Sequence, residues 1–203
     1  MAYGYLGQNT PNQTVNNSGV FSITDSANLQ SQGKLGGSLE LIEEQTVSAV
    51  SYIDFTSIQE DKYDVHFLQL DNITSTANLN GGYQFFENGI IRTASDYQYA
   101  QQYGLATGTF AEQKSTAINR IVAQNYFSAN PTSAYAYFYD LGNSSKYSFC
   151  TYHCWVGGQS LFMFGGGVSP LTSLVTGIRC YTSGTNAISG TAKLYGVKQI
   201  WVT

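Results

Sequence analysis

The chain has few charged residues, prolines and methionines. Asp, Glu, Lys and Arg make up 11% of its 203 residues, against about a quarter in ordinary soluble domains. There are 3 Pro and 2 Met, the net charge is −4, and no block of Lys or Arg occurs. Binding to nucleic acid needs clustered basic side chains that neutralise phosphates. We therefore expect no nucleic-acid partner.

The sequence also lacks segments typical of export or membrane insertion. Residues 1–11 have neither a basic start nor an apolar core, so no Sec signal peptide is predicted. The longest apolar runs are much shorter than the roughly 20 residues of a transmembrane helix, so we expect no membrane insertion. The cysteines, Cys150, Cys154 and Cys180, form an odd count, which argues against a secreted domain held together by disulfides.

No motif of a common enzyme family occurs. The phosphate-binding G-x-x-x-x-G-K-[ST], the dinucleotide fingerprint and G-x-S-x-G are all missing. A polysaccharide depolymerase would need a pair of close carboxylates, for which Asp54, Asp64 and Asp140 are candidates. Polar residues at strand ends are the simpler interpretation. We therefore predict a non-enzymatic protein without a cofactor.

Cys150, His153 and Cys154 lie close together in the sequence and raise the question of a zinc site. In a strand the two cysteines would be roughly 13 Å apart, at about 3.3 Å per residue. Zinc requires sulfurs about 2.3 Å from one centre, and His153 has the opposite parity, so it points to the other face. We predict that both thiols are small core residues and that the cluster binds no metal.

The chain is rich in aromatic residues and glycine, with 16 Tyr, 11 Phe and 21 Gly. From Thr46 onward, short runs rich in Tyr, Phe, Val and Thr alternate with turns of Gly, Asn and Ser, a pattern typical of antiparallel strands. Residues 165–167 are three glycines and predict a turn. About nine or ten strands predict an all-β fold, an antiparallel jelly-roll-like β-sandwich over residues 46–203. The sequence predicts strands over residues 47–58, 63–72, 118–127, 133–141, 146–156, 159–164, 174–181 and 188–202, and a hairpin within residues 83–93.

Residues 1–45 differ from the rest, and we call them the N-terminal arm. The arm is predicted to be extended, with a short helix over residues 26–32 that Thr24 or Asp25 caps and Gly33 ends. It has too little apolar surface for a core, since ordering each backbone residue costs roughly 1–2 kcal/mol. We predict that it docks on another chain; a flexible tail is the alternative. The expected anchors are Tyr5, Leu6, Val20, Phe21, Ile23, Leu35 and Leu39.

Tyr135, Tyr137 and Tyr139 share one face of a predicted strand. Tyrosine offers a large contact area with a polar tip. The stripe therefore fits three roles: a contact with another subunit, a surface on which a sugar stacks, or a sheet face covered by a loop. The sequence leaves all three open.

Two parts of the chain carry motifs found in other proteins. The first part contains GYLGQ at residues 4–8, PNQ at 11–13, NSGVFS at 17–22 and GGSLELI at 36–42. It resembles the N-terminal segment of small structural proteins of tailed bacteriophages, especially phages of aquatic bacteria. The body, which opens with SYIDF at residues 51–55 and closes with LYGV at 194–197, resembles β-sandwich modules of tail-fibre, knob and head-decoration proteins.

The resemblance implies a virion structural protein assembled in the host cytoplasm. Such a protein would be a homotrimer on the particle surface, attached through its arm to other capsid or tail proteins, with the sandwich projecting outward. Head decoration and tail-fibre or baseplate positions both remain open. The alternative function is a lectin-like receptor-binding module that recognises host surface polysaccharide.

Overall fold

The computed structural model describes residues 23–24, 27–28, 39–157, 161–183, 185 and 187–198, with residues 124–126 described by their backbone alone. The chain divides into two units. The larger unit is Leu41–Val197, and the other comprises Met1–Glu40 with Lys198–Thr203. Among the described residues, no helix has the length and apolar character needed to cross a membrane.

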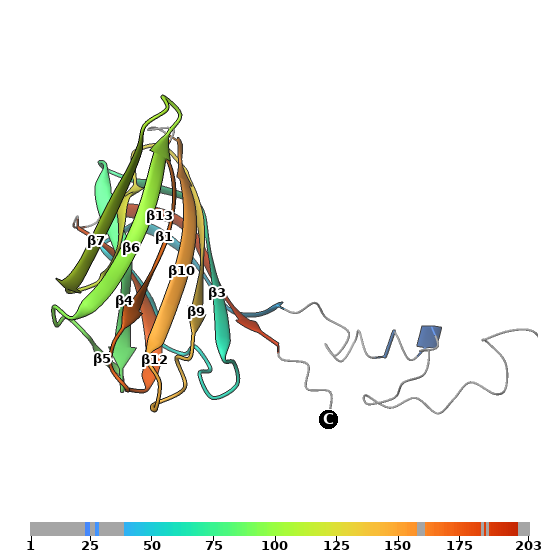
Figure 1. The fold of residues 1–203 in the computed structure, drawn as a ribbon. Coiled ribbons are helices and arrows are strands. Elements are labelled where there is room, and N and C mark those ends of the chain that lie inside the picture. The colour runs from blue at the N-terminus through green and yellow to red at the C-terminus, as the bar shows by residue number, and fades with distance from the viewer. Residues whose placement is uncertain are drawn as a thin grey trace, which may run out of the picture. The chain divides into compact units, whose positions relative to one another are not determined.

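The protein is all-β in its described part, as the sequence predicts, and its strands form two antiparallel sheets (Figure 1). In spatial order, the larger sheet consists of β1 (Leu39–Val50), β13 (Ile188–Val197), β3 (Val65–Ser75), β9 (Thr132–Tyr139), β10 (Ser148–Val156), β11 (Leu161–Ser169), β6 (Tyr97–Leu105) and β7 (Phe110–Ile118). The smaller sheet consists of β2 (Tyr52–Phe55), β12 (Val175–Thr182), β4 (Leu79–Glu87) and β5 (Ile90–Ile91), and β8 (Ile121–Phe127) also pairs with β4.

The chain passes repeatedly from one sheet to the other. Strand β2 is in the smaller sheet, β3 in the larger, β4 in the smaller and β6 in the larger; β8 and β9 are again in different sheets, as are β11 and β12. As a result β2, β12, β4 and β8 are neighbours in one sheet. In the other, β3 is followed by the β9–β10–β11 meander and then by β6 and β7.

The core lies between the two sheets because alternate residues of each strand point inward. In β10 the inward residues are buried and the outward ones exposed, residue by residue. Across the core, the Tyr83 ring of β4 meets the Phe138 ring of β9 edge-on, with centroids 5.1 Å apart. Cys150 and Cys154 are buried in this core together with Cys180, which confirms the prediction that they are core residues.

The single strand predicted over residues 47–58 is in fact two strands in different sheets. Strand β1 belongs to the larger sheet and β2 to the smaller, with Ser51 between them. Just before this break, Ala49 adopts a positive φ of 54°, and its amide donates a hydrogen bond to the Ser189 hydroxyl at 3.0 Å. The parity of the buried positions is therefore not continuous from Val47 to Phe55.

The glycines at residues 165–167, predicted as a turn, lie inside strand β11. Core side chains approach this strand too closely for larger residues. A Cβ on Gly165 would lie 2.7 Å from the Tyr152 hydroxyl, and one on Gly167 would lie 2.7 Å from a methyl carbon of Ile121. These glycines make room for neighbouring side chains and do not end the strand.

The sheet begins earlier than the sequence predicts. Strand β1 starts at Leu39, so residues 39–45 belong to a strand and not to an arm outside the sandwich. Ile42, Val47 and Val50 of this strand pack against the core, which explains why the segment joins the sheet. Of the other predicted anchors, Ile23 is exposed, while Tyr5, Leu6, Val20, Phe21 and Leu35 lie outside the described residues. Only residues 27 and 28 of the expected helix are described.

Candidate functional site

The outer face of the larger sheet carries many exposed aromatic side chains. They lie on β9, β10 and β11, at the positions that alternate with the core-facing residues of these strands. In β10 the outward positions are Phe149, Thr151, His153 and Trp155. The large hydrophobic residues exposed on these three strands are Tyr135, Phe149, Trp155, Phe162 and Phe164.

The predicted tyrosine stripe forms a ridge of packed rings on this face. Tyr137 stacks on Tyr139 with centroids 6.5 Å apart, and Phe67 of β3 lies 4.9 Å from Tyr137 and 6.0 Å from Tyr135. The Tyr139 hydroxyl is 3.3 Å from that of Thr151. Of the three tyrosines, Tyr135 is the one that lines the hollow described next. A subunit contact or a sugar-stacking role for the ridge stays a prediction.

A shallow hollow of about 540 Å³ lies beside the ridge, over β3, β9, β10 and β11. Ser133 of β9 is paired with Trp155 of β10, which is in turn paired with Phe162 of β11. Because Ser133 is small, it leaves space between larger side chains. The pairing of β3 with β9 shifts between Leu70 and Ile73. The remaining lining residues are Phe67, Gln69, Leu70, Asp71, Ala134, Tyr135, His153 and Cys154.

The walls of the hollow combine flat apolar rings with a few polar groups. The polar side chains are those of Gln69, Asp71, Ser133 and His153, and no Lys or Arg is among the described lining residues. The Tyr135 hydroxyl and His153 Nδ1 are 2.9 Å apart, so the phenol donates to Nδ1 when the imidazole carries its proton on Nε2. Apolar walls with a few placed polar groups are the usual chemistry of a small-molecule site.

Trp155 and Phe162 were not among the site residues predicted from the sequence. A signal for Trp155 was present, because the parity that turns His153 away from the core also turns Trp155 outward. Asp71 had no such signal. Its place at the hollow depends on how β3 aligns with β9, two strands far apart in the sequence.

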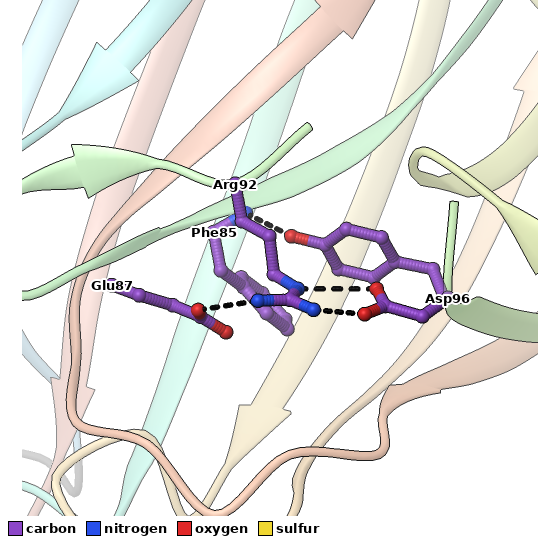
Figure 2. A network of polar contacts seen from close by, with 5 residues as sticks. Phe85, Glu87, Arg92 and Asp96 are labelled. Atoms are coloured by element: carbon purple, nitrogen blue, oxygen red, sulfur yellow. Dashed lines mark hydrogen bonds and ion pairs between the residues drawn. The ribbon is translucent and has the colours of Figure 1, made fainter. Parts of the chain in front are cut away.

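A second polar cluster lies at the end of the smaller sheet and has a structural role. Figure 2 shows Arg92 between the carboxylates of Glu87 and Asp96. Arg92 Nη1 donates to Glu87 Oε2 at 2.8 Å and Nε donates to Asp96 Oδ1 at 3.1 Å, while Nη2 pairs with Asp96 Oδ2. The hydrogen bond to Asp96 raises the pKa of Arg92. The cluster ties the β4–β5 hairpin to the start of β6.

The candidate carboxylates for depolymerase chemistry lie in different surroundings. Asp54 accepts two hydrogen bonds from Arg179, at 2.7 and 2.6 Å. Asp140 accepts one from Lys146 at 3.0 Å, and the backbone of Asp140 bonds to that of Asp64. The first two carboxylates are thus engaged in ion pairs.

The cysteine and histidine cluster is divided between two faces of β10. Cys150 and Cys154 face the core, and burial raises the pKa of both thiols, whereas His153 lies on the outer face. Within the part of the chain that the structure describes, no group of three His, Cys, Asp or Glu side chains is placed to hold a metal ion.

Comparison of the chain with protein-family models and with curated proteins finds no match.

Proposed function

We propose that the protein is a non-enzymatic structural component of a tailed-bacteriophage particle. It forms a homotrimer on the particle surface, attaches to other capsid or tail proteins through its N-terminal arm, and projects a jelly-roll-like sandwich outward. The resemblance of residues 4–42 to the N-terminal segments of such proteins supports this proposal, as does a composition low in charge and rich in tyrosine.

The strand connectivity supports the jelly-roll part of the proposal. A jelly roll has eight strands in two four-stranded sheets, with successive strands that alternate between them. Here β2-β12-β4-β8 form one such sheet. The other runs from β3 to β7, with the β9–β10–β11 meander in place of one strand. Viral capsid domains and lectins are among the proteins that use this architecture.

The observation that carries the proposal is the edge strand β1. It ends the larger sheet on one side, and its neighbour within the sheet is β13. Leu39 and Leu41 of this strand are 43% and 50% exposed. Exposed leucines on an edge strand favour association with another chain. Residues 1–38 of the arm precede this strand directly in the sequence. We therefore assign particle attachment to the arm and trimer contacts to the β1 edge.

Deletion of residues 1–37 tests the attachment. The truncated chain keeps all of β1 and should fold into a soluble protein with the far-ultraviolet circular dichroism of an all-β fold. In the phage that encodes it, the truncated protein should be missing from purified particles. Normal occupancy on particles would place the attachment surface on the sandwich. Failure of the truncated chain to fold would make the arm part of the core.

The oligomeric state is tested by light scattering during size-exclusion chromatography at micromolar concentration. We expect the mass of a trimer for the full-length protein. Replacement of both edge leucines by polar residues, Leu39→Thr with Leu41→Thr, should shift the mass toward monomer. Matched replacement of exposed Ile90 in the other sheet, Ile90→Thr, should not. A full-length protein that is monomeric throughout would contradict the trimer.

A second function, recognition of a host surface glycan, is favoured by the aromatic hollow. Trp155 and Phe162 are 51% and 37% exposed on the outer face of the sheet, and they line the hollow together with Gln69 and Asp71. Recognition of a receptor is compatible with a place on the particle surface, so the two functions do not compete.

A further inference from the structure

We propose that the hollow over β3, β9, β10 and β11 is a subsite for a neutral pyranose ring of a polysaccharide. The proposal rests on the glycan-recognition function above and adds the binding residues and the ligand class. Trp155 and Phe162 supply the stacking surface, and Asp71 and Gln69 supply hydrogen bonds. The predicted tyrosine ridge contributes Tyr135 alone.

The aromatic platform is exposed and nearly continuous. Trp155 is 51% exposed and Phe162 37%, and their rings are 6.5 Å apart with an angle of 38° between their planes. A pyranose presents C–H groups on its faces and hydroxyls around its rim. Its apolar face therefore fits an exposed aromatic ring, and the contact removes apolar surface from water on both sides.

The polar groups match the rim of such a ring. A carboxylate accepts hydrogen bonds, and an amide both donates and accepts, so Asp71 and Gln69 together complement a pair of neighbouring hydroxyls. Within the described residues, the side chains of Gln69, Asp71 and Ser133 make no hydrogen bond or ion pair with another protein group. They remain available to water or to a ligand.

The charge of the hollow selects among occupants. Asp71 is the charged residue of the described lining, so an anionic sugar such as a uronate would meet a like charge there. Lys193 pairs with Gln69 across β13 and β3 but lies outside the lining, and its ammonium is 3.5 Å from the Glu44 carboxylate. A second copy of the chain seated here would have to supply a cation to this carboxylate of Asp71, because burial of an unpaired charge is costly. A neutral sugar donates hydroxyl protons to that carboxylate and leaves its open side in water.

The site is largely formed before a ligand arrives. Its four strands are hydrogen-bonded to neighbours on both sides within the sheet. The hydrogen bond between Tyr135 and His153 also holds two lining side chains in place. Rigid walls lower the ordering cost of binding, which matters for a weak ligand such as one sugar ring.

Binding is tested with the full-length protein on an array that carries neutral oligosaccharides, among them maltose, cellobiose and lactose series, beside uronate-containing and sialylated ones. We expect neutral glycans to bind and anionic ones to bind more weakly. Calorimetry with the strongest neutral oligosaccharide should then show at least about tenfold weaker binding for Trp155→Ala and for Asp71→Asn. The matched control is Phe149→Ala, because Phe149 lies on the same face of the same strand and is 43% exposed, yet does not line the hollow. Its affinity should stay within about twofold of the wild type.

Three results would overturn the proposal. If the wild type binds a neutral glycan and Trp155→Ala binds it equally well, the subsite lies elsewhere although glycan recognition survives. If Tyr137→Ala or Tyr139→Ala abolishes binding while Trp155→Ala does not, the ridge is the site. If the wild type binds no neutral glycan, the subsite and glycan recognition fail together. Incorporation of the Trp155→Ala protein into particles is measured separately, because it tests only the structural function.

Discussion

Buried His66 links this protein's stability to pH. Its side chain is fully buried, and Nε2–H donates a hydrogen bond to the Ile58 carbonyl at 2.8 Å. Nδ1 has no hydrogen-bond partner among the described residues, and the Tyr63 ring lies edge-on with a centroid distance of 6.0 Å. Burial lowers the pKa of His66 below its ordinary value of 6.5, although the Ile58 hydrogen bond and the charge of Asp64 oppose this effect.

The first prediction concerns acid stability. The unfolded chain takes up the His66 proton near pH 6.5, whereas the folded chain takes it up only at lower pH. Below about pH 6.5 the unfolded state therefore binds more protons, and the free energy of unfolding falls as the pH falls, until the folded pKa is passed. Urea titrations between pH 8 and 5 measure this slope.

Two histidine variants isolate the contribution of His66. His66→Gln should unfold at lower urea throughout, and its stability should depend less on pH than that of the wild type. His153→Gln, altered at the exposed histidine, is the matched control for the loss of an imidazole and should unfold at nearly the wild-type urea concentration. A His66→Gln protein with the full slope would assign the pH dependence to other groups.

The second prediction concerns the thiols. Cys150, Cys154 and Cys180 are buried, and burial raises the pKa of each thiol. Because the thiolate is the reactive form, the folded protein should react with Ellman's reagent very slowly at pH 8. All three thiols should react rapidly in concentrated guanidinium chloride. Rapid reaction of one thiol without denaturant would place that cysteine at the surface.

Between elements, the Arg92 cluster fixes the β4–β5 hairpin against β6. The Arg92 and Glu87 side chains are only 18% and 15% exposed. The third prediction is that Arg92→Met lowers the free energy of unfolding by roughly 1–3 kcal/mol, since Glu87 and Asp96 lose their charged donor. Chemical denaturation measures the loss.

Lys114 provides the matched control for Arg92. It pairs with Glu112 at 3.2 Å, but both side chains are mostly exposed. Lys114→Met should change the free energy of unfolding by less than about 0.5 kcal/mol. Equal losses for the two variants would mean that the Arg92 cluster contributes no more than a surface ion pair.

How far an element can be predicted from sequence depends on whether its two faces differ. Strands β9, β10 and β12 have one face in the core, so their apolar residues alternate and the sequence locates them well. Strand β7 was missed because it is an edge strand with both faces largely open, so nothing forces an apolar alternation. The start of β1 was placed too late for the same reason. Strand β6 was also missed, although one face lies in the core, because buried Gln101 interrupts its apolar positions.

The candidate site was harder to predict than the strands, since it depends on which strands become neighbours. Tyr135 and the outward parity of β10 follow from local sequence. The presence of Asp71 and Trp155 at one hollow does not, because it requires β3 to pair with β9 and β9 with β10, with a register shift after Leu70. Long-range pairing of this kind leaves no mark in a local pattern.

The whole molecule combines a two-sheet sandwich, an edge strand β1 with exposed leucines, and an N-terminal segment that precedes β1 in the sequence. Few charges and many tyrosines suit a protein whose surface is shared with neighbours in an assembly. The same sandwich would serve on the head or at the tail.

The position of the protein on intact particles is the measurement that decides whether it is a virion component. If the protein is a virion component as proposed, cryo-electron microscopy of the particles, with antibody fragments raised against the sandwich, should show label at three-fold symmetric surface sites, either on the head or at the tail. The arm should lie toward the particle and the aromatic hollow should face solvent. Purified particles that carry no label, and whose proteins yield no peptide of this chain by mass spectrometry, would contradict the proposal.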